Sequence, residues 1–297
     1  MSTLGVGGNA EVFLEPSKTE DVSTIFRIRA ARSFPLYILG GGTNVVFTDG
    51  LVKGVVLSTR RLKDFWWNAE GEQATLDAEC GYPLPLAVSE SAKKGLTGAE
   101  FAQGIPGTIG GAVTGNAGAG GRSVGDLLVE LTTVEGDGSV KKWKRGEFSY
   151  SYRYFSLTSY SALPSAASYA VPERLFISCK MKFQRAAFIE IERNVNAFRQ
   201  VRARQPHGAK SAGCAFKNPG AESAGRLLDI CGCKGLRVGG AVVSESHANF
   251  LLNTGDATGT DIFELMESCR DIVFRRTGIR LEPEIKFLGF AADLFFV

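Results

Sequence analysis

Apolar residues recur along the chain with two different periods, and this pattern predicts a mixture of strands and helices. Short apolar runs between glycine-rich or polar stretches favour strands. The strand candidates are residues 10–14, 36–39, 45–47, 55–57, 74–78, 129–134, 175–183 and 279–288. Helical segments lie between them without an internal repeat, so the predicted class is mixed α and β.

Two helices are predicted in the first third of the chain. Residues 19–32 carry apolar positions at helical spacing, and acidic Glu20 and Asp21 fall in the first turn, where negative charge stabilises a helix. Residues 84–94 also have a helical pattern, and Gly95 follows at the position where a left-handed residue closes a helix.

A third helix is predicted to begin near residue 188 and to stop before Pro206. Its apolar face, at spacing i, i+3, i+7 and i+10, consists of Phe188, Ile191, Val195 and Phe198. Residues 158–172, which precede it, are rich in Ser, Tyr, Ala and Pro and indicate a surface excursion. We place the main domain boundary near residue 185.

Two further helices are predicted in the last third. Ser223 is suited to cap a short helix that ends at Gly232. Asp261 together with Glu264 resembles a capping box at the start of a longer helix, and Gly278 is the expected left-handed residue at its end. The apolar face of the longer helix consists of Ile262, Leu265, Met266, Cys269, Ile272 and Val273.

Length and composition narrow the function classes. The chain has 297 residues, and because a single domain has about 150, two domains are expected. Hydrophobic residues make up 44% and charged residues 22%, which is ordinary for a globular protein. A net charge of +3 is too small to indicate binding to nucleic acid or to an anionic membrane. The first residues lack a basic segment followed by an apolar stretch, and no run of about 18 apolar residues occurs, so we expect neither a signal peptide nor a membrane span.

The cysteines are dispersed and form no CxxC pair. Since the chain has only two histidines, we expect no metal site. Dispersed thiols in a long chain fit the cytoplasm, where most of them act as small buried apolar side chains. The six are Cys80, Cys179, Cys214, Cys231, Cys233 and Cys269.

Glycine is the one residue type whose use points to a site, because its 36 residues are clustered in the sequence. The first cluster, Gly40-Gly41-Gly42-Thr43-Asn44, lies between two strand candidates, and successive glycine N–H groups suit a pyrophosphate. For this run alone, an ordinary strand turn is an equally good interpretation. No Gly-Lys-Ser/Thr follows, and Val45 occupies the third glycine position of a GxGxxG pattern. A dinucleotide bound here would therefore lie on neither a P-loop nor a Rossmann scaffold.

A denser glycine cluster covers residues 104–119 and is almost devoid of periodicity. Such a segment loses much conformational entropy on folding and brings few side chains to a core. A glycine-rich segment of this kind is expected where a flat, polar cofactor lies against the backbone. A merely flexible loop is a poorer interpretation, because the segment contains the apolar Ile109. The candidate cofactor-binding residues are Gly104, Ile105, Pro106, Gly107, Thr108, Gly110, Gly111, Asn116, Gly118 and Ala119.

Six motifs occur in order along nearly the whole chain. They are LGGGTN at 39–44, AQGIPGTIGGAVTGNAGA at 102–119, YR at 152–153, SAGCAFKNP at 211–219, GGAVVSESHANFLLN at 239–253 and LEPEIKFLG at 281–289. Each is weak alone, but the set resembles the UDP-N-acetylenolpyruvoylglucosamine reductase family, and its compact spacing resembles the shorter, type II-like branch.

The resemblance implies an α+β chain with two domains. Residues 1–184 would form a two-part FAD-binding domain of the vanillyl-alcohol-oxidase (PCMH) type, split near residue 60, and residues 185–297 an α/β domain that binds a UDP-sugar. It further implies FAD as cofactor, NADPH as electron donor, and a role in peptidoglycan synthesis in the bacterial cytoplasm. No protein, nucleic-acid or membrane partner is implied.

The resemblance assigns the chemistry to three separated residues. Arg153, which alone reads as a surface arginine beside tyrosines, would be the cation over the enolpyruvyl group, and a planar guanidinium suits a carboxylate that gains enolate character. Cys214 stands where the family commonly has serine as proton donor, and a thiol, with a reference pKa of about 8.5, is a far stronger acid than an alkanol. Glu284 would assist Arg153 or support the proton donor; in an extended strand it faces the same side as Glu282.

Three more residues match family positions that contact the UDP-sugar: Lys217, Asn218 and His247. Without the resemblance they read as ordinary loop and capping residues. Gly120 stands where an aromatic residue usually follows, and we expect one side of a pocket to be more open there.

The predicted function is the NADPH-dependent reduction of UDP-N-acetylenolpyruvoylglucosamine to UDP-N-acetylmuramate, in two half-reactions at one flavin. Two alternatives stay open at this point. One is an FAD oxidase or dehydrogenase of the same fold that acts on another substrate. The other is a flavin-free module that binds a sugar nucleotide and would purify without colour.

Overall fold

The computed structural model describes residues 2–157, 173–203, 205–206 and 208–290. The chain divides into two compact units. Unit 1 comprises Met1–Glu11, Gly42–Lys53 and Ala203–Val297, and unit 2 comprises Val12–Gly41 and Gly54–Arg202. The units do not follow the predicted boundary near residue 185, because helix α4 (Phe188–Arg202) belongs to unit 2. The functional assignment of residues 1–184 and 185–297 stays a prediction.

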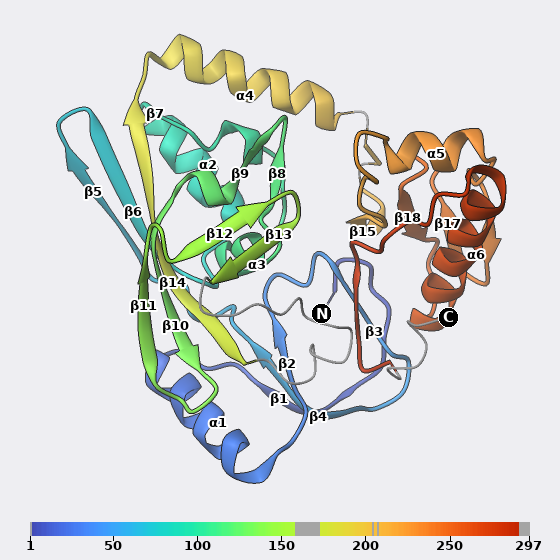
Figure 1. Ribbon diagram of the computed structural model, residues 1–297, viewed down its shortest axis with the longest axis horizontal. Coiled ribbons are helices and arrows are strands. Elements are labelled where there is room, and N and C mark those ends of the chain that lie inside the picture. The colour runs from blue at the N-terminus through green and yellow to red at the C-terminus, as the bar shows by residue number, and fades with distance from the viewer. Residues whose placement is uncertain (1, 158–172, 204, 207, 291–297) are drawn as a thin grey trace. The chain divides into compact units, whose positions relative to one another are not determined.

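Unit 2 is built on an antiparallel sheet with the strand order β11-β10-β14-β6-β5, in which β7 also pairs with β14 (Figure 1). The longest strand, β14, buries every second residue from Leu175 to Phe183, because one face of the strand is turned to the hydrophobic core and the other face is not. The strands are β5 (Phe65–Glu70), β6 (Gln73–Glu79), β7 (Leu96–Thr97), β10 (Leu128–Glu135), β11 (Val140–Lys144) and β14 (Arg174–Arg185).

Strand β14 takes part in two hydrophobic cores. Leu175 and Ile177 pack in a core with Val22 and Phe26 of α1 (Thr19–Arg32). The three buried residues further along, Cys179, Met181 and Phe183, pack in a core with helices α2 (Leu84–Lys93) and α3 (Ile109–Thr114). Unit 2 also contains most of a three-stranded sheet with the order β1-β4-β2. Its strands are β1 (Ala10–Leu14), β2 (Leu36–Leu39) and β4 (Val52–Ser58).

Three smaller features of unit 2 lie near the predicted cofactor segments. They are the hairpin of β12 (Phe148–Ser151) and β13 (Tyr154–Leu157), the pair β8 (Gly118–Ala119) and β9 (Arg122–Ser123), and two single turns, η1 (Glu100–Ala102) and η2 (Val124–Asp126). Figure 1 shows α2, α3 and this hairpin on the same side of the large sheet.

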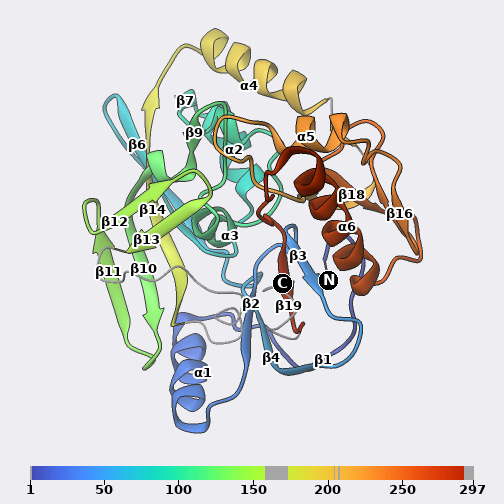
Figure 2. The same ribbon diagram turned by 45° about the vertical axis from the view of Figure 1, so that its right-hand side comes forward.

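Unit 1 contains a four-stranded antiparallel sheet with the order β15-β18-β17-β16. Helices α5 (Ala224–Ile230) and α6 (Gly259–Thr277) pack with this sheet in one core (Figure 2). A separate parallel pair joins β3 (Val45–Phe47) to β19 (Lys286–Leu288). The sheet strands are β15 (Lys210–Cys214), β16 (Arg237–Val238), β17 (Ala241–Val243) and β18 (Phe250–Asn253).

The predicted helices are confirmed, with one correction at a cap. The hydroxyl of Ser223 accepts a hydrogen bond from the Arg226 N–H, and Gly278 has the left-handed φ of 72°. The capping box of α6, however, consists of Thr258 and Asp261, not of Asp261 and Glu264. The Thr258 hydroxyl accepts from the Asp261 N–H while the Asp261 carboxylate accepts from the Thr258 N–H, so the helix starts three residues earlier than predicted.

Two other expectations differ from the structure. The strand predicted over 279–288 is limited to Lys286–Leu288, because Pro283 lacks an N–H group and forms only an isolated bridge with Phe216. Helix α3 was not predicted, because its glycine-rich sequence has no periodicity; its buried Ile109, Ala112 and Val113 supply the packing. The predicted excursion at 158–172 lies outside the described residues.

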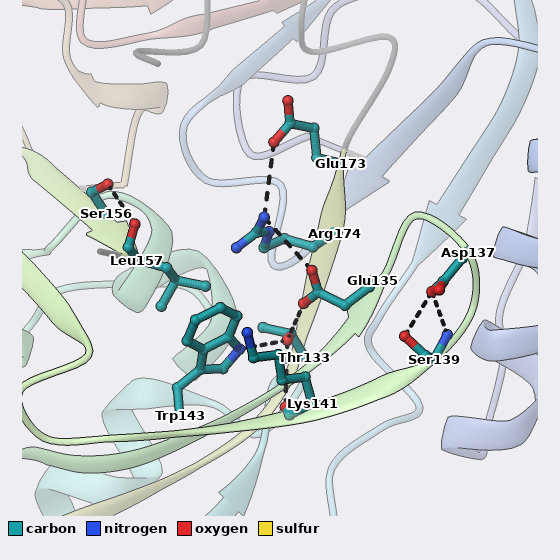
Figure 3. Close-up of polar contacts among 10 residues, drawn as sticks. All are labelled: Thr133, Glu135, Asp137, Ser139, Lys141, Trp143, Ser156, Leu157, Glu173 and Arg174. Atoms are coloured by element: carbon teal, nitrogen blue, oxygen red, sulfur yellow. Dashed lines mark hydrogen bonds and ion pairs between the residues drawn. The ribbon is translucent and has the colours of Figure 1, made fainter. Parts of the chain in front are cut away.

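A polar network lies where β10, β11 and β14 meet (Figure 3). The indole N–H of buried Trp143 donates to the hydroxyl of Thr133 over 2.8 Å, and that hydroxyl donates to the Glu135 carboxylate. Arg174 forms an ion pair with Glu135 at 3.6 Å and lies over the Trp143 ring. This network lets the sheet bury an indole without leaving its donor unpaired.

Within the described residues, no helix is long and apolar enough to cross a membrane. The same residues contain no group of three or more His, Cys, Asp or Glu side chains arranged to hold a metal ion.

Candidate functional site

The two glycine-rich segments predicted to bind a cofactor meet in unit 2. A Cβ atom on Gly41 would lie 2.8 Å from the Cα atom of Gly107, and one on Gly40 would lie 2.8 Å from the hydroxyl oxygen of Thr108. A side chain at either glycine would therefore collide with the second segment. The close approach of the two backbones explains glycine at position 41, and at position 40 the neighbour is the Thr108 side chain.

Packing also explains part of the second segment. A Cβ on Gly110 would lie 2.8 Å from the Cβ of Cys80, so glycine is needed there to bring α3 against the end of β6. Gly104 and Gly107 have φ values of 75° and 109°, which favour glycine. Thr108 is the N-cap residue of α3, with its hydroxyl accepting from the Gly111 N–H.

The backbone donors of this region fit a polyanionic cofactor. Among the described residues, the N–H groups of Gly40, Gly41, Gly107 and Thr108 donate to no protein acceptor. Unpaired backbone donors without neighbouring side chains are what a pyrophosphate requires. The residues present thus fit the pyrophosphate of FAD.

Asn116 joins the second glycine segment to the hairpin that carries Arg153. Its amide nitrogen donates to the Ser151 carbonyl over 2.7 Å, and its amide oxygen accepts from the Gly125 N–H over 3.0 Å. The side chain is buried, and its backbone has a left-handed φ of 38°. Asn116 therefore has a structural role at the hairpin, and the predicted FAD contact stays a prediction.

Arg153 occupies the turn between β12 and β13 in a left-handed conformation, with φ of 54°. This conformation is unfavourable for a residue with a Cβ, and such strain is often found at functional sites. One guanidinium nitrogen donates to the Gly118 carbonyl over 3.4 Å, and the group lies over the ring of exposed Tyr152. The structure thus brings Arg153 to the predicted cofactor segment of unit 2.

Gly120 has no room for a side chain. Its φ is 59°, and a Cβ would lie 2.9 Å from the ring of Phe198 on α4. The aromatic residue next to this position is therefore supplied by α4 and not by residue 120. The more open pocket predicted at Gly120 stays a prediction.

Unit 1 brings the other two predicted catalytic residues together. Strand β15 ends at Cys214, which is opposite Phe250 of β18. Just beyond it, the Glu284 N–H donates to the Ala215 carbonyl over 2.8 Å, and the Lys217 N–H donates to the Glu282 carbonyl over 2.9 Å. The segments that carry Cys214 and Glu284 thus run antiparallel, side by side.

Charged side chains gather along these paired segments. The ammonium group of Lys217 forms an ion pair with Glu282, which is exposed. Glu284 and Lys286 are partly buried and alternate with the buried Ile285 and Phe287, so they share the face that carries Glu282. Burial, and secondly the charge of Lys217, lower the pKa of Lys286 to about 8.

Asn218 and His247 both lie at the start of α5. The Asn218 amide oxygen accepts from the Ala224 N–H over 3.0 Å, and a Cβ on Gly225 would lie 3.0 Å from the His247 ring. Burial lowers the pKa of His247, and its Nδ1 accepts from the Asn249 N–H over 3.3 Å. The lowered pKa favours the uncharged ring, and Nδ1 acts as a hydrogen-bond acceptor.

The predicted residues fall into two sets. Unit 1 carries Cys214, Lys217 and Glu284 on two paired segments and also contains Asn218 and His247. Unit 2 contains Arg153 and most of the predicted cofactor residues. Sequence reasoning missed Lys286, although its place two residues after Glu284 in a strand was a usable signal. It also missed Asn249, which has no local signal.

None of the six cysteines is disulfide-bonded, and five of them are buried, as the sequence predicts. Cys214 is the exception: it is partly exposed. A partly exposed thiol next to ionisable residues can react, whereas a thiol buried in the core is inert.

Both units have relatives among known proteins. Residues 10–144 match the family described as FAD binding domain, and residues 205–288 match the family described as UDP-N-acetylenolpyruvoylglucosamine reductase, C-terminal domain. The UDP-N-acetylenolpyruvoylglucosamine reductase of Moorella thermoacetica is 37% identical over 288 residues, which are 97% of this chain and 90% of the relative. The enzyme of the same name from Synechococcus elongatus is 35% identical, over 99% of this chain and 93% of the relative.

A solved structure extends the similarity to three dimensions. The crystal structure of UDP-N-acetylenolpyruvylglucosamine reductase from Thermus caldophilus matches with a TM-score of 0.77 at 32% identity. The match covers 97% of this chain and 95% of that one.

Proposed function

This chain belongs to the UDP-N-acetylenolpyruvoylglucosamine reductase family, and we propose that it reduces UDP-N-acetylenolpyruvoylglucosamine to UDP-N-acetylmuramate with electrons from NADPH. The family and the α+β fold class predicted from the sequence are confirmed. The observation that carries the proposal is the pairing of the Cys214 and Glu284 segments within a chain of this family. We place the reaction in the cytoplasm, where nucleotide-linked precursors of peptidoglycan are made.

FAD is the cofactor, and the segments 40–44 and 104–119 would hold it. The unpaired N–H groups of Gly40, Gly41, Gly107 and Thr108 support a pyrophosphate contact at their meeting point. When bound, FAD would supply the redox chemistry, the passage of a hydride equivalent from NADPH to C3 of the enolpyruvyl group.

Arg153 stabilises the charge that develops on the substrate. Addition of a hydride at C3 moves the electron pair of the double bond toward C2 and the adjoining carboxylate. A guanidinium is planar and permanently charged, so it binds that carboxylate through two parallel hydrogen bonds. The left-handed turn at Arg153 supports a fixed, preorganised position for this cation.

Cys214 completes the reaction as proton donor. The electron pair at C2 takes the thiol proton, so that a C–H bond forms, the S–H bond breaks and a thiolate remains, which solvent protonates again. Cys214 is partly exposed and lies beside the strand of Glu284, which supports this role. Glu284 orients the group that donates the proton, and Lys217, Asn218 and His247 bind the diphosphate and uridine.

The proposal is tested by measuring NADPH oxidation with and without UDP-N-acetylenolpyruvoylglucosamine. We expect a yellow protein whose flavin is bleached by NADPH and reoxidised by the substrate. In Cys214→Ala, bleaching should persist while reoxidation slows by about 10²-fold or more, the usual contribution of a general acid. Cys214→Ser should keep substantial activity.

Two results would contradict these assignments separately. A colourless protein that cannot be reconstituted with FAD excludes the reductase itself. Reoxidation of Cys214→Ala at the wild-type rate leaves the reductase in place but removes Cys214 as the acid.

A further inference from the structure

Asn249 makes four hydrogen bonds to residues in or next to the proposed site: two to Phe216, one to Ala215 and one to His247. It lies just before β18, and its side chain is 3% exposed. Its amide nitrogen donates to the carbonyl of Phe216 over 2.8 Å, and its amide oxygen accepts from the N–H of the same residue over 2.9 Å. One side chain thus pairs with both backbone groups of Phe216.

This pairing extends the sheet where the strands themselves separate. The ladder of β15 and β18 reaches Cys214 and Phe250, and the Ala215 N–H then donates to the Asn249 carbonyl over 2.8 Å. Beyond that point the chain before β18 turns away, with the Phe250 N–H bonded to the His247 carbonyl. The Asn249 amide takes the place of the next strand residue opposite Phe216.

The ladder alone does not fix the direction of Cys214. Its register is irregular between Ser211 and Cys214, and Gly213 has a φ of 80°. A bulge of this kind re-aims the side chains that follow it. After the bulge the ladder resumes only at Cys214 and Phe250, and the bonds that Asn249 makes to Ala215 and Phe216 hold the backbone directly beyond it.

The same segment is paired on its other edge with the strand of Glu284. Ala215 accepts from the Glu284 N–H, and Lys217 donates to the Glu282 carbonyl. Asn249 also bonds His247 through its own N–H, which donates to Nδ1. Asn249 therefore bonds His247 directly, and it bonds the residues next to Cys214 and Lys217 in the chain. Glu284 is bonded to Ala215, which also bonds Asn249.

We infer that Asn249 is a positioning residue for the proposed reduction, which fixes the backbone between Cys214 and Lys217 so that the thiol is aimed at C2 of the bound substrate. The inference rests on the proposed function, because the step it affects is transfer of the Cys214 proton. Asn249 itself gives up no proton and contacts no reacting atom. A displacement of about 1 Å in such a site lowers a rate by about 10²-fold.

Asn249→Ser tests this, because serine is too short to reach both groups of Phe216. We expect bleaching of the flavin by NADPH to change less than about twofold, while reoxidation by substrate slows by about 10²-fold. The solvent deuterium isotope effect on reoxidation should increase, since proton transfer becomes slower. A second readout needs no turnover: the rate at which iodoacetamide alkylates Cys214, followed by mass spectrometry, should change.

Asn253→Ser is the matched control. Asn253 is another buried asparagine, at the opposite end of β18, and its side chain bonds Leu4, Gly255 and Ala257. Only its backbone pairs with β15, opposite Lys210 at the end of that strand remote from Cys214. This variant should lose stability while the isotope effect and the alkylation rate stay at wild-type values. If Asn249→Ser does not fold, Asn249→Gln, which keeps the amide one methylene further out, should slow reoxidation to an intermediate degree.

The inference is overturned if the Asn249 variants reoxidise at the wild-type rate, or if Asn253→Ser reproduces their effects. A wild-type protein that does not reduce the substrate overturns the proposed function instead. In that case unchanged alkylation of Cys214 in the Asn249 variants would overturn the positioning role as well.

Discussion

The side-chain amide of Asn44 donates a hydrogen bond of 2.9 Å to the carbonyl oxygen of Glu284, 240 residues further along the chain. The carbonyl of Asn44 in turn accepts from the Lys286 N–H over 3.1 Å, where β3 begins to pair with β19. The sequence predicts Asn44 as an FAD contact, yet its amide is bonded to the strand that carries Glu284. This residue therefore connects the glycine turn to the proposed proton-donor network.

Asn44→Ala should affect the second half-reaction more than FAD binding. Loss of one partly buried hydrogen bond costs about 1 kcal/mol of stability and removes the donor that Asn44 supplies to the Glu284 carbonyl. We expect reoxidation by substrate to slow by about tenfold, while the FAD dissociation constant, measured by fluorescence titration, stays within about twofold. Asn68→Ala, at an exposed asparagine that bonds Asp77, is the control. Weaker FAD binding with normal reoxidation would show that Asn44 serves the cofactor instead.

Arg153→Lys should lower the rate of reoxidation without unfolding the hairpin. Lysine keeps the charge and has the same difficulty with a left-handed φ, but it lacks the planar fork that binds a carboxylate through two bonds. We expect a decrease of about 10²-fold, as for loss of a preorganised donor at a transition state, in stopped-flow reoxidation. Arg122→Lys, at an exposed arginine on β9, should have no effect. Equal rates for Arg153→Lys and wild type would exclude a bidentate contact.

Lys286 makes stability depend on pH in a defined direction. Its pKa in the folded protein is lowered by burial to about 8 from 10.5, so between these values the unfolded chain binds more protons than the folded one. Rising pH therefore favours the folded state over this range. The free energy of unfolding of wild type, relative to that of Lys286→Met, should increase from about pH 8 to pH 10.5 in urea titrations. A difference that is constant with pH would contradict the lowered pKa.

Thr133→Val should destabilise unit 2 without affecting the chemistry. Valine has the same shape but leaves the Trp143 indole N–H without its acceptor and removes one donor from the Glu135 carboxylate (Figure 3). A buried unpaired donor costs about 1–3 kcal/mol, measurable as a lower urea midpoint. Thr132→Val, on the neighbouring and less buried position of β10, should change stability by less than about 0.5 kcal/mol. Similar losses for both variants would show that the hydroxyl of Thr133 contributes no specific bond.

Features with local causes follow from the amino-acid sequence alone. The apolar face of α6 repeats every turn, and Gly278 follows where a left-handed residue is required, so both were predicted from neighbouring residues alone. The bounds of α1 and β1 were predicted for the same reason. The family, too, follows from the sequence, because six motifs in a fixed order specify it even though each is weak.

Contacts between segments far apart in the chain depend on the fold. Pairing of residues 215–217 with 282–284 joins segments far apart in the chain, and no periodicity in either of them names its partner. The importance of Asn249 and Asn44 depends on this pairing, because an asparagine has no distinctive pattern until a particular backbone group lies opposite its amide. The glycines at positions 41 and 110 are explained in the same way: the backbone of Gly107 and the side chain of Cys80, not a local turn, leave no room for a Cβ.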